Sequence, residues 1–414
     1  MCGICGFTGP GSRELLTRMN RTLTHRGPDE EGYFQDGRAS LAMRRLSIVD
    51  LAGGSQPQHN EDQSLWVVFN GELYNFQELR EGLQRAGHRF ATKRSDTENL
   101  VHLYEEFGET WPEAARVNGM FGLALWDARA GKLLLYRDRI GKKPLYYAQV
   151  GGDLVFGSEI KAILAHPAVS SELDFASLHH YFSLKNTSAP ATAFKAVRQL
   201  EPGQYLVWQN GQTRLAPYWR LDFAPAGPAP APREAADRLA WLLDDAVRLR
   251  MQCDAPYGAY LSGGVDSSSV VALMRRHQQT PVKTFCLGYR EQAQGQFWGK
   301  AQDIHYARLM SQRFGSEHHE HLIGQEEFAE SLTQVQRAFD EPFSGTISTF
   351  FLSILIRRHV KVALSGDGAD ELFGSYLSHR LAWPIHHYLA MARDGGTLRE
   401  EDFSSLRPFD TPVS

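Results

Sequence analysis

The sequence predicts an α+β layered sandwich followed by an α/β domain built on a doubly wound parallel sheet. In the first half, short strand-like runs alternate with turn signals, and only two helical stretches interrupt them. In the second half, strands alternate with helices, which is typical of a parallel sheet. Residues 222–233 between the halves are rich in Pro and Ala, which favours an extended linker over a long loop within one domain. We therefore expect domains at residues 1–221 and 234–414.

Six apolar runs bounded by turn residues predict the strands of the first domain. They are Leu65–Phe69, Phe121–Trp126, Lys132–Arg137, Leu145–Tyr147, Leu154–Phe156 and Tyr205–Trp208. Two stretches, Asn75–Ala86 and Thr97–Phe107, carry apolar residues at helical spacing. Because the strands come in runs and the helices are set apart from them, we expect α+β layers.

The second domain is expected to alternate helices and strands along its whole length. The predicted helices are Glu234–Met251, Asp266–Arg276 and Ile304–Phe314, followed by helical stretches to about Arg358. The predicted strands are the apolar runs Gly258–Leu261, Val282–Leu287 and Val360–Leu364. This alternation predicts a parallel sheet with helices on its faces.

Composition excludes several classes of protein. The 414 residues contain 44 Lys plus Arg and 48 Asp plus Glu, a net charge of −4 that indicates neither a nucleic-acid nor a membrane-surface partner. The longest apolar run, near Ile347–Ile356, is shorter than the roughly 20 residues that span a bilayer. The N-terminus lacks a signal-peptide pattern, and four cysteines do not make a disulfide framework. We therefore expect a soluble, cytoplasmic protein.

A glycine-containing loop follows the predicted strand Gly258–Leu261 and opens the next helix. Its sequence is Ser262-Gly263-Gly264-Val265-Asp266-Ser267-Ser268. Glycines let backbone N–H groups surround an anion, and a helix N-terminus adds favourable dipole. Asp266 is suited to hold Mg²⁺ against phosphate oxygens. The loop lacks the Gly-Lys-Ser/Thr ending of a Walker A motif, and the alternative is a plain strand–turn–helix junction.

An acidic loop follows the predicted strand Val360–Leu364, with the sequence Ser365-Gly366-Asp367-Gly368-Ala369-Asp370-Glu371. A parallel sheet binds ligands at the carboxyl ends of its strands. Both loops leave such ends, so we expect their carboxylates to converge on one metal–phosphate site. The alternative is a solvated acidic turn that caps the next helix.

Cys2 is a candidate nucleophile. After removal of Met1 it carries both a thiol and a free α-amine, whose reference pKa values of about 8.5 and 7.7–8.0 allow proton transfer between them. A zinc or redox role for Cys2 and Cys5 is disfavoured because the chain has no second such pair. The remaining alternative is an N-terminal strand with two small apolar side chains.

Five motifs of the first half resemble the glutaminase domain of class II amidotransferases, an N-terminal-nucleophile hydrolase fold. They are Met1-Cys2-Gly3-Ile4-Cys5-Gly6, His25-Arg26-Gly27-Pro28-Asp29, Arg45-Leu46-Ser47-Ile48-Val49-Asp50, Asn70-Gly71-Glu72-Leu73-Tyr74-Asn75 and Ser95-Asp96-Thr97-Glu98. Followed by the two loops of the second half, their order resembles the family of glutamine-hydrolysing asparagine synthetases. The motifs run from Cys2 to Tyr376 and so cover most of the chain.

The resemblance implies roles for residues of the first half. Cys2 matches the nucleophile that attacks the glutamine amide, and Asn70 with the Gly71 backbone matches the oxyanion hole. Arg45 matches the group that clamps the glutamine α-carboxylate, whereas Glu72 and Asp96 match partners of the α-amine and amide. The implied glutamine site comprises Arg45, Leu46, Ser47, Ile48, Val49, Asn70, Gly71, Glu72 and Asp96.

The resemblance also implies that the second half uses ATP and Mg²⁺ to convert aspartate to β-aspartyl-AMP, which ammonia then amidates. The implied ATP site comprises Leu261, Ser262, Gly263, Gly264, Asp266, Ser267, Ser268, Leu287, Ser365 and Gly366. Asp266 and Asp370 match magnesium ligands. Asp367 matches the acyl-adenylate step, where some family members carry glutamate. Family members are often dimers through the glutaminase domain, so the resemblance implies a homodimer.

The sequence departs from the family pattern at its C-terminus. The family's synthetase domain normally continues beyond the acidic loop, whereas here a polar tail, Arg393 to Ser414, matches no known motif. We therefore expect an incomplete synthetase domain, intact glutaminase chemistry, and impaired or absent amide synthesis. The alternatives are an amidotransferase for another carboxylate acceptor, a form with glutaminase activity only, and a non-catalytic binding remnant.

Three further features are expected to be structural. The run His318-His319-Glu320-His321 would point successive side chains to opposite faces of an extended segment, so we do not expect a metal site there. Cys253 and Cys286 are interpreted as small buried residues.

Overall fold

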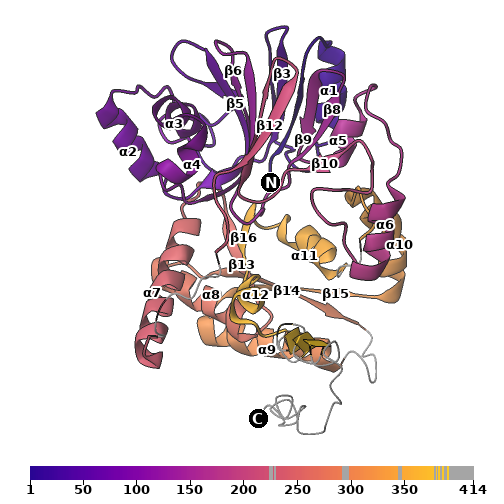
Figure 1. The fold of residues 1–414 in the computed structure, drawn as a ribbon. Helices are drawn as coiled ribbons and strands as arrows, with labels where there is room; N and C mark the ends of the chain where they lie inside the picture. Colours follow the sequence, from indigo (N-terminus) through magenta and orange to yellow (C-terminus); the bar gives the residue numbers. More distant parts are fainter. Residues whose placement is uncertain are drawn as a thin grey trace.

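The structure is a computed structural model that forms two antiparallel sheets and one parallel sheet (Figure 1). It describes residues 1–222, 227, 230–290, 298–343, 347–376, 379, 381–382, 385–386 and 389–390. Half of the predicted Pro/Ala linker, residues 223–226 and 228–229, lies outside these residues, and the polar tail Arg393 to Ser414 lies wholly outside them. Within the described ranges, no helix combines the length and the apolar character needed to cross a membrane.

The first half is a sandwich of two six-stranded sheets, with strand orders β10-β8-β9-β1-β3-β2 and β12-β11-β7-β6-β5-β4. The strands are β1 (Gly3–Thr8), β2 (Glu30–Gln35), β3 (Ala39–Arg45), β4 (Gln58–His59), β5 (Leu65–Leu73), β6 (Gly119–Asp127), β7 (Lys132–Arg137), β8 (Tyr146–Val150), β9 (Asp153–Gly157), β10 (Arg198–Gln199), β11 (Gln204–Gln209) and β12 (Gln212–Pro217). Within each sheet, neighbouring strands pair antiparallel.

Helices α1 (Arg13–Arg21) and α5 (Ile160–Leu164) cover one outer face of this sandwich (Figure 1). The other face carries α2 (Phe76–Ala86), α3 (Asn99–Phe107), η1 (Gly108–Thr110) and α4 (Trp111–Ala114). Helix α6 (Phe175–Leu184) lies below the sheets, beside the second half (Figure 1). Between the sheets, side chains of both pack into one core that includes Ile4, Leu41, Val68, Trp126 and Phe156, all shielded from solvent. This arrangement confirms the predicted α+β layers.

The second half is a four-stranded parallel sheet of order β15-β14-β13-β16. Its elements are α7 (Pro232–Arg250), β13 (Tyr257–Tyr260), α8 (Val265–His277), β14 (Lys283–Tyr289), α9 (Trp298–Phe314), β15 (Glu317–Ile323), α10 (Gln325–Ala338), α11 (Ser348–Ile356), β16 (Val362–Leu364) and α12 (Ala369–Phe373). Helices α8 and α9 lie on one face of the sheet and α11 on the other (Figure 1). The predicted doubly wound parallel sheet is therefore confirmed.

Two details of the second half differ from the prediction. Helix α7 begins at Pro232 rather than Glu234, because proline is favoured in the first turn of a helix, where its missing N–H is not needed. The stretch Glu317–Ile323 is strand β15, although the pattern of helical stretches ran across it. β15 lies at the edge of the sheet, where charged residues are common and hide the strand signal.

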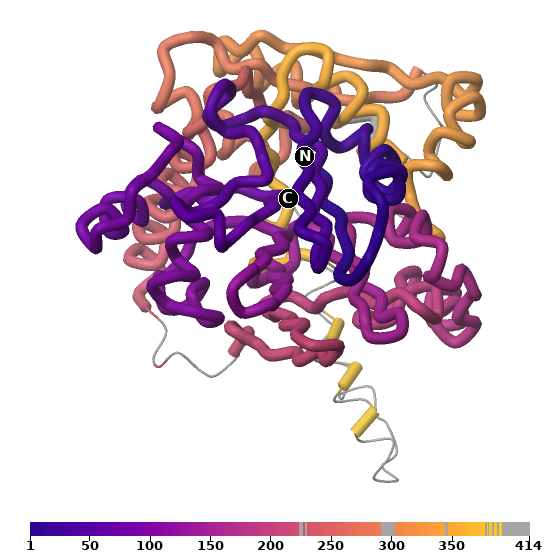
Figure 2. Tube along the Cα trace, turned by 90° about the horizontal axis from the view of Figure 1, so that it is seen from above, coloured from indigo at the N-terminus to yellow at the C-terminus, as the bar shows by residue number. Residues whose placement is uncertain are grey.

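The two halves contact each other beside the chain's N-terminus (Figures 1 and 2). Asp254, between α7 and β13, donates its N–H to the carbonyl of Ile48 at 2.9 Å. Its carboxylate accepts from the N–H of Asp50 at 2.8 Å and pairs with Arg94 at 3.1 Å. The ammonium of Lys361, just before β16, lies 2.6 Å from Asp29. These bonds tie the loop after β3 to the parallel sheet.

Candidate functional site

The first candidate site is a cavity of about 80 Å³ at the N-terminus. Four segments form most of its wall: the start of the chain, the loop after β3, the middle of β5 and the segment before α3. The lining residues are Met1, Cys2, Arg45, Leu46, Ile48, Val49, Gly54, Gln56, Phe69, Asn70, Gly71, Glu72, Ser95, Asp96, Thr97, Met120 and Lys143. The structure thus brings the predicted glutamine-site residues together, apart from Ser47, which does not line the cavity.

Cys2 is held at the start of β1, a central strand of its sheet. The N–H of Leu46 approaches the Cys2 sulfur at 3.4 Å, and the thiol faces the Leu46 carbonyl at 3.8 Å. Arg26 donates its Nε–H to the Cys2 carbonyl at 2.8 Å. Burial raises the pKa of the Cys2 thiol, against the opposing effect of the Leu46 N–H. The thiol is therefore protonated at neutral pH and needs a base to become a nucleophile.

Arg26 is in turn fixed by Glu159, which follows β9. The Glu159 carboxylate lies 2.8 Å from Arg26, 3.0 Å from His25 and 2.8 Å from Lys161. Burial alone would raise the pKa of Glu159, but the hydrogen bonds from these three basic side chains lower it to about 2. The ordinary value is 4.5.

We expect Glu159 to stabilise the fold at neutral pH and to lose this effect in acid. A carboxylate whose pKa is lower in the folded than in the unfolded chain stabilises the fold at any pH above the unfolded-state pKa. This stabilisation is lost as the pH falls from about 4.5 towards about 2. The shift corresponds to a contribution on the order of 3 kcal/mol. Glu159→Gln should therefore lower the unfolding midpoint more at pH 7 than at pH 3, measured by circular dichroism in urea. The control is Glu172→Gln, at an exposed ion pair, which should change the unfolding midpoint little at either pH. An equal fall in the midpoint of Glu159→Gln at pH 7 and pH 3 would contradict the prediction.

Asn70 lies on β5, and its side chain lacks a hydrogen-bond partner in the described part of the chain. The residue is 1% exposed, and neither the amide nitrogen nor the oxygen of its side chain is bonded. Buried polar groups nearly always have partners, and leaving one unpaired costs about 1–3 kcal/mol. Because Asn70 lines the Cys2 cavity, its carboxamide is available to a ligand there.

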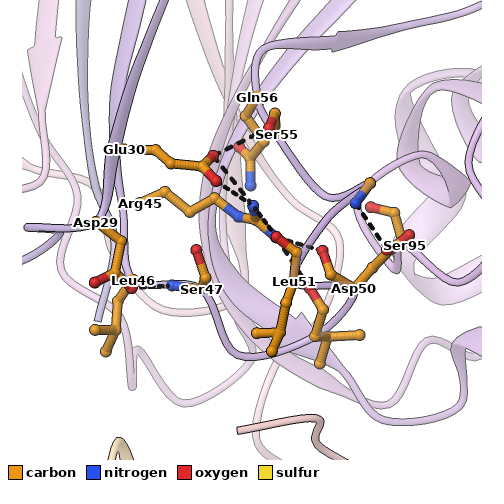
Figure 3. Close-up of polar contacts among 12 residues, drawn as sticks. Asp29, Glu30, Arg45, Leu46, Ser47, Asp50, Leu51, Ser55, Gln56 and Ser95 are labelled. Carbon is orange, nitrogen blue, oxygen red and sulfur yellow. Dashed lines mark hydrogen bonds and ion pairs between the residues drawn. The ribbon is translucent and has the colours of Figure 1, made fainter.

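Arg45 lines the cavity, and its two terminal nitrogens already have protein acceptors (Figure 3). They donate to the Glu30 carboxylate at 3.1 Å and to the carbonyls of Val49 and Asp50 at 3.1 and 2.7 Å. Arg45 therefore holds the loop that forms one wall of the cavity. Ser47 points its N–H to Asp29 at 2.9 Å, which explains why it lies outside the cavity lining.

Three ionisable side chains of the cavity have shifted pKa values. Burial, helped by the nearby Asp96, raises the pKa of Glu72 to about 8. Burial also raises the pKa of Asp96 to about 6, although the Leu73 N–H donates to it at 3.0 Å. Burial lowers the pKa of Lys143 to about 8. The side chains that line the cavity therefore carry little net charge at neutral pH. Charged groups of a bound ligand would shift their protonation states.

The second candidate site is a cavity of about 510 Å³ at the carboxyl ends of β13, β14 and β16. Its lining residues are Tyr260, Leu261, Ser262, Asp266, Ser267, Phe285, Cys286, Leu287, Tyr289, Asp303, Ser348, Thr349, Leu352, Ser365, Gly366, Asp367, Gly368, Asp370, Glu371 and Tyr376. The structure thus brings both predicted loops to one cavity, as expected for a parallel sheet. Of the predicted ATP-site residues, Gly263, Gly264 and Ser268 do not line it.

The two loops are in direct contact. A Cβ atom on Gly366 would lie 2.8 Å from the Cβ of Asp266 and 2.9 Å from the nitrogen of Ser267, so only glycine allows this approach. Gly263 has a φ of 82° and packs on the backbone of Tyr306, which explains why it turns away from the cavity. The residues present suit a magnesium–phosphate group: helix α8 begins at Val265, and two carboxylates, Asp266 and Asp370, share the cavity.

Sequence reasoning missed several lining residues of both cavities. In the first cavity, Gln56 donates to the Phe69 carbonyl and accepts its N–H, and Lys143 approaches the Met1 sulfur at 3.0 Å. In the second, Tyr260 is the last residue of β13 and Phe285 lies within β14. No catalytic or binding motif in the sequence marks any of these four residues. These residues reach the cavities through sheet pairing rather than through a local motif.

Two family models match the chain and follow the division between the sheets. A glutamine amidotransferase domain matches residues 1–219, and an asparagine synthase domain matches residues 238–409. The chain thus joins a glutamine amidotransferase domain to an asparagine synthase domain. The chain belongs to the family of glutamine-hydrolysing asparagine synthetases.

Two curated relatives named for asparagine synthesis and one solved structure are similar to this chain. The glutamine-hydrolysing asparagine synthetase 1 of Bacillus subtilis is 34% identical over 91% of this chain and 60% of that protein. A relative from Methanocaldococcus jannaschii, also named for asparagine synthesis, is 32% identical over 92% of this chain and 76% of its own length. A solved glutamine phosphoribosylpyrophosphate amidotransferase from B. subtilis covers 66% of this chain and 64% of its own at 17% identity, with a TM-score of 0.40. The chain spans about 60% of the length of the first of these relatives.

Proposed function

We propose that the protein is a glutamine-dependent asparagine synthetase, with a glutaminase site at Cys2 and an ATP-dependent synthetase site at the second cavity. The observation that carries the proposal is the buried, unpartnered carboxamide of Asn70 in the same cavity as Cys2. A side-chain donor that has no protein acceptor and shares a cavity with a thiol is suited to form an oxyanion hole for acyl transfer. The family membership supports glutamine as the amide donor.

In the first reaction, the Cys2 thiolate attacks the side-chain carbonyl carbon of glutamine. The Cys2 α-amine, freed by removal of Met1, takes the thiol proton and passes it to the leaving nitrogen. The side-chain amide of Asn70 and the N–H of Gly71 stabilise the tetrahedral oxyanion, and ammonia leaves as the C–N bond breaks. Water then hydrolyses the thioester to glutamate. Glu72 and Asp96 bind the glutamine α-amine, and the loop held by Arg45 encloses its carboxylate end.

In the second reaction, a carboxylate oxygen of the aspartate side chain attacks the α-phosphorus of ATP, and pyrophosphate leaves to give β-aspartyl-AMP. Ammonia then attacks the acyl carbon and displaces AMP, giving asparagine. Ser262, Ser267 and the N-terminus of α8 bind the phosphates. Asp266 and Asp370 would hold Mg²⁺, which when bound would offset negative charge on the phosphate oxygens. We assign Leu261, Leu287, Ser365 and Gly366 to the adenosine, and Asp367 to the acyl-adenylate step. A homodimer and a cytoplasmic location complete the proposal.

One reaction tests both halves of the proposal. The chain is incubated with glutamine, ATP·Mg²⁺ and aspartate, and glutamate, pyrophosphate and asparagine are quantified by chromatography. Because both predicted loops line one cavity, we expect all three products, with asparagine and pyrophosphate in equal amounts. Asparagine well below glutamate would instead agree with the impaired amide synthesis expected from the sequence. Glutamate without pyrophosphate would contradict the synthetase half, and pyrophosphate without asparagine would point to another carboxylate acceptor. If no glutamate forms, the glutaminase half is wrong.

A further inference from the structure

A cluster of two histidines and two glutamates lies outside both cavities. Ligand atoms of Glu61, His88 and His102 lie within 4.8 Å of one another, the one such group found among the described residues. Glu105, one turn after His102 on α3, places its carboxylate between the two imidazoles. Its Oε2 is 2.9 Å from His102 Nδ1 and 3.3 Å from His88 Nδ1. Oε2 of Glu61 lies 4.0 Å from His102 Nδ1.

These distances suit a small tetrahedral ion. Bonds of about 2.0–2.2 Å to nitrogen and oxygen place tetrahedral ligand atoms about 3.4 Å apart. Two of the measured separations are within about half an ångström of that value, and the exposed carboxylate of Glu61 is free to close the third. The contacts of Glu105 with the two imidazoles are ones that a cation would replace.

The surroundings of the cluster resemble the outer shell of a metal centre. The Asn60 side chain donates to Glu105 Oε1 at 2.8 Å, and the N–H of Arg89 donates to Glu61 Oε1 at 2.9 Å, so each carboxylate keeps its other oxygen for the cluster. The far nitrogen of His88, Nε2, lies 2.8 Å from Glu106, as is usual for a metal-bound imidazole, and His102 is fully buried. Phe90 packs on its ring with the centroids 4.6 Å apart, which fixes the ring orientation. Oriented imidazoles and hydrogen-bonded carboxylates are typical of protein zinc sites.

We propose that Glu61, His88, His102 and Glu105 form a structural Zn²⁺ site. Two imidazoles favour zinc over magnesium or calcium, which prefer oxygen ligands. The ion would join three segments: the loop between β4 and β5, the connection after α2, and α3. Because α3 directly follows residues 95–98, the bound ion would also brace the segment that carries Asp96 into the first cavity.

The test is a titration of the full chain, first freed of metal by a chelator, with Zn²⁺ in a calorimeter. We expect one saturable equivalent and a higher thermal unfolding midpoint. Co²⁺ should give the visible absorption of a tetrahedral site without a thiolate-to-metal band, also in the Cys2→Ala variant. A thiolate band, or a spectrum lost in Cys2→Ala, would place the metal at Cys2 and overturn the proposal.

Variants separate this cluster from other histidines. His88→Gln and Glu61→Gln leave the buried His102 intact, and each should weaken Zn²⁺ binding by at least roughly 10-fold. His321→Gln is the matched control because His321 forms a similar pair with Glu327 at 2.7 Å in the second half, and it should bind Zn²⁺ as the unchanged chain does. Absence of saturable binding, or unchanged binding by His88→Gln, would overturn the proposal.

Discussion

Replacement of Cys2 by alanine is expected to abolish glutamate formation from glutamine. Cys2 is the one cysteine among the residues that line the first cavity, so the substitution removes its thiol. Asn70 and the loop held by Arg45 stay in place. Without its nucleophile, an acyl-transfer site keeps only binding and oxyanion stabilisation, so we expect a fall in kcat on the order of 10⁴-fold or more. Glutamate release by the purified variant, followed with a coupled dehydrogenase assay, measures the effect.

The same variant should still make asparagine when ammonium salts replace glutamine, because the second cavity does not include Cys2. Cys253→Ala is the matched control: its thiol lies outside both cavities, and glutamate formation should stay within about twofold of the unchanged chain. Substantial glutamate release by Cys2→Ala would contradict the assignment of the nucleophile.

Replacement of Asp266 by asparagine is expected to remove ATP-dependent pyrophosphate release. Asparagine preserves the shape of the side chain at the point where it touches Gly366. It removes the negative charge that the proposed Mg²⁺ ligand would supply. A metal that stabilises phosphate charge supplies several kcal/mol, so its loss corresponds to at least about 100-fold in rate. Pyrophosphate release with aspartate and ATP·Mg²⁺ measures the effect, and glutamate formation from glutamine should remain.

Ligand-induced stabilisation distinguishes lost binding from lost chemistry in this variant. At 100 times its dissociation constant, a ligand stabilises the folded chain by about 2.7 kcal/mol, and this thermal shift with ATP·Mg²⁺ should shrink in Asp266→Asn. Asp237→Asn, on the exposed surface of α7, should behave like the unchanged chain in both assays. Normal pyrophosphate release by Asp266→Asn would exclude the proposed metal ligand.

Much of the fold could be predicted because local signals agreed with the tertiary structure. The run Lys132–Arg137 is strand β7 at its predicted bounds, since a continuous apolar run between turn residues marks it clearly. Strands β1 and β2 lacked such signals: β1 is buried on both faces and contains two glycines, whereas β2 begins with Glu30 and Glu31 at a sheet edge. Their pairing with β3, rather than their own pattern, makes them strands.

The residues of the candidate sites likewise include some that could be predicted from the sequence and some that could not. Motif residues such as Asn70 and Asp266 could be predicted because the chemistry needs them in a fixed local setting. Lys143 could not, because it reaches the Cys2 cavity only after β6 and β7 have paired. The zinc cluster was also hidden, because His88 and His102 come from different elements and fit no ligand spacing.

The pairing of β16 with β13 also sets the order in which a growing chain acquires its two activities. Strand β13 can pair with β14 soon after both leave the ribosome. Its other neighbour is β16, where Tyr257 pairs with Val362, about a hundred residues later in the chain. Loop closure of that length slows pairing, and the acidic loop follows only after β16. The last residue of the Cys2 cavity is Lys143. During synthesis on the ribosome, the Cys2 cavity is therefore encoded well before the second cavity, whose acidic loop follows β16.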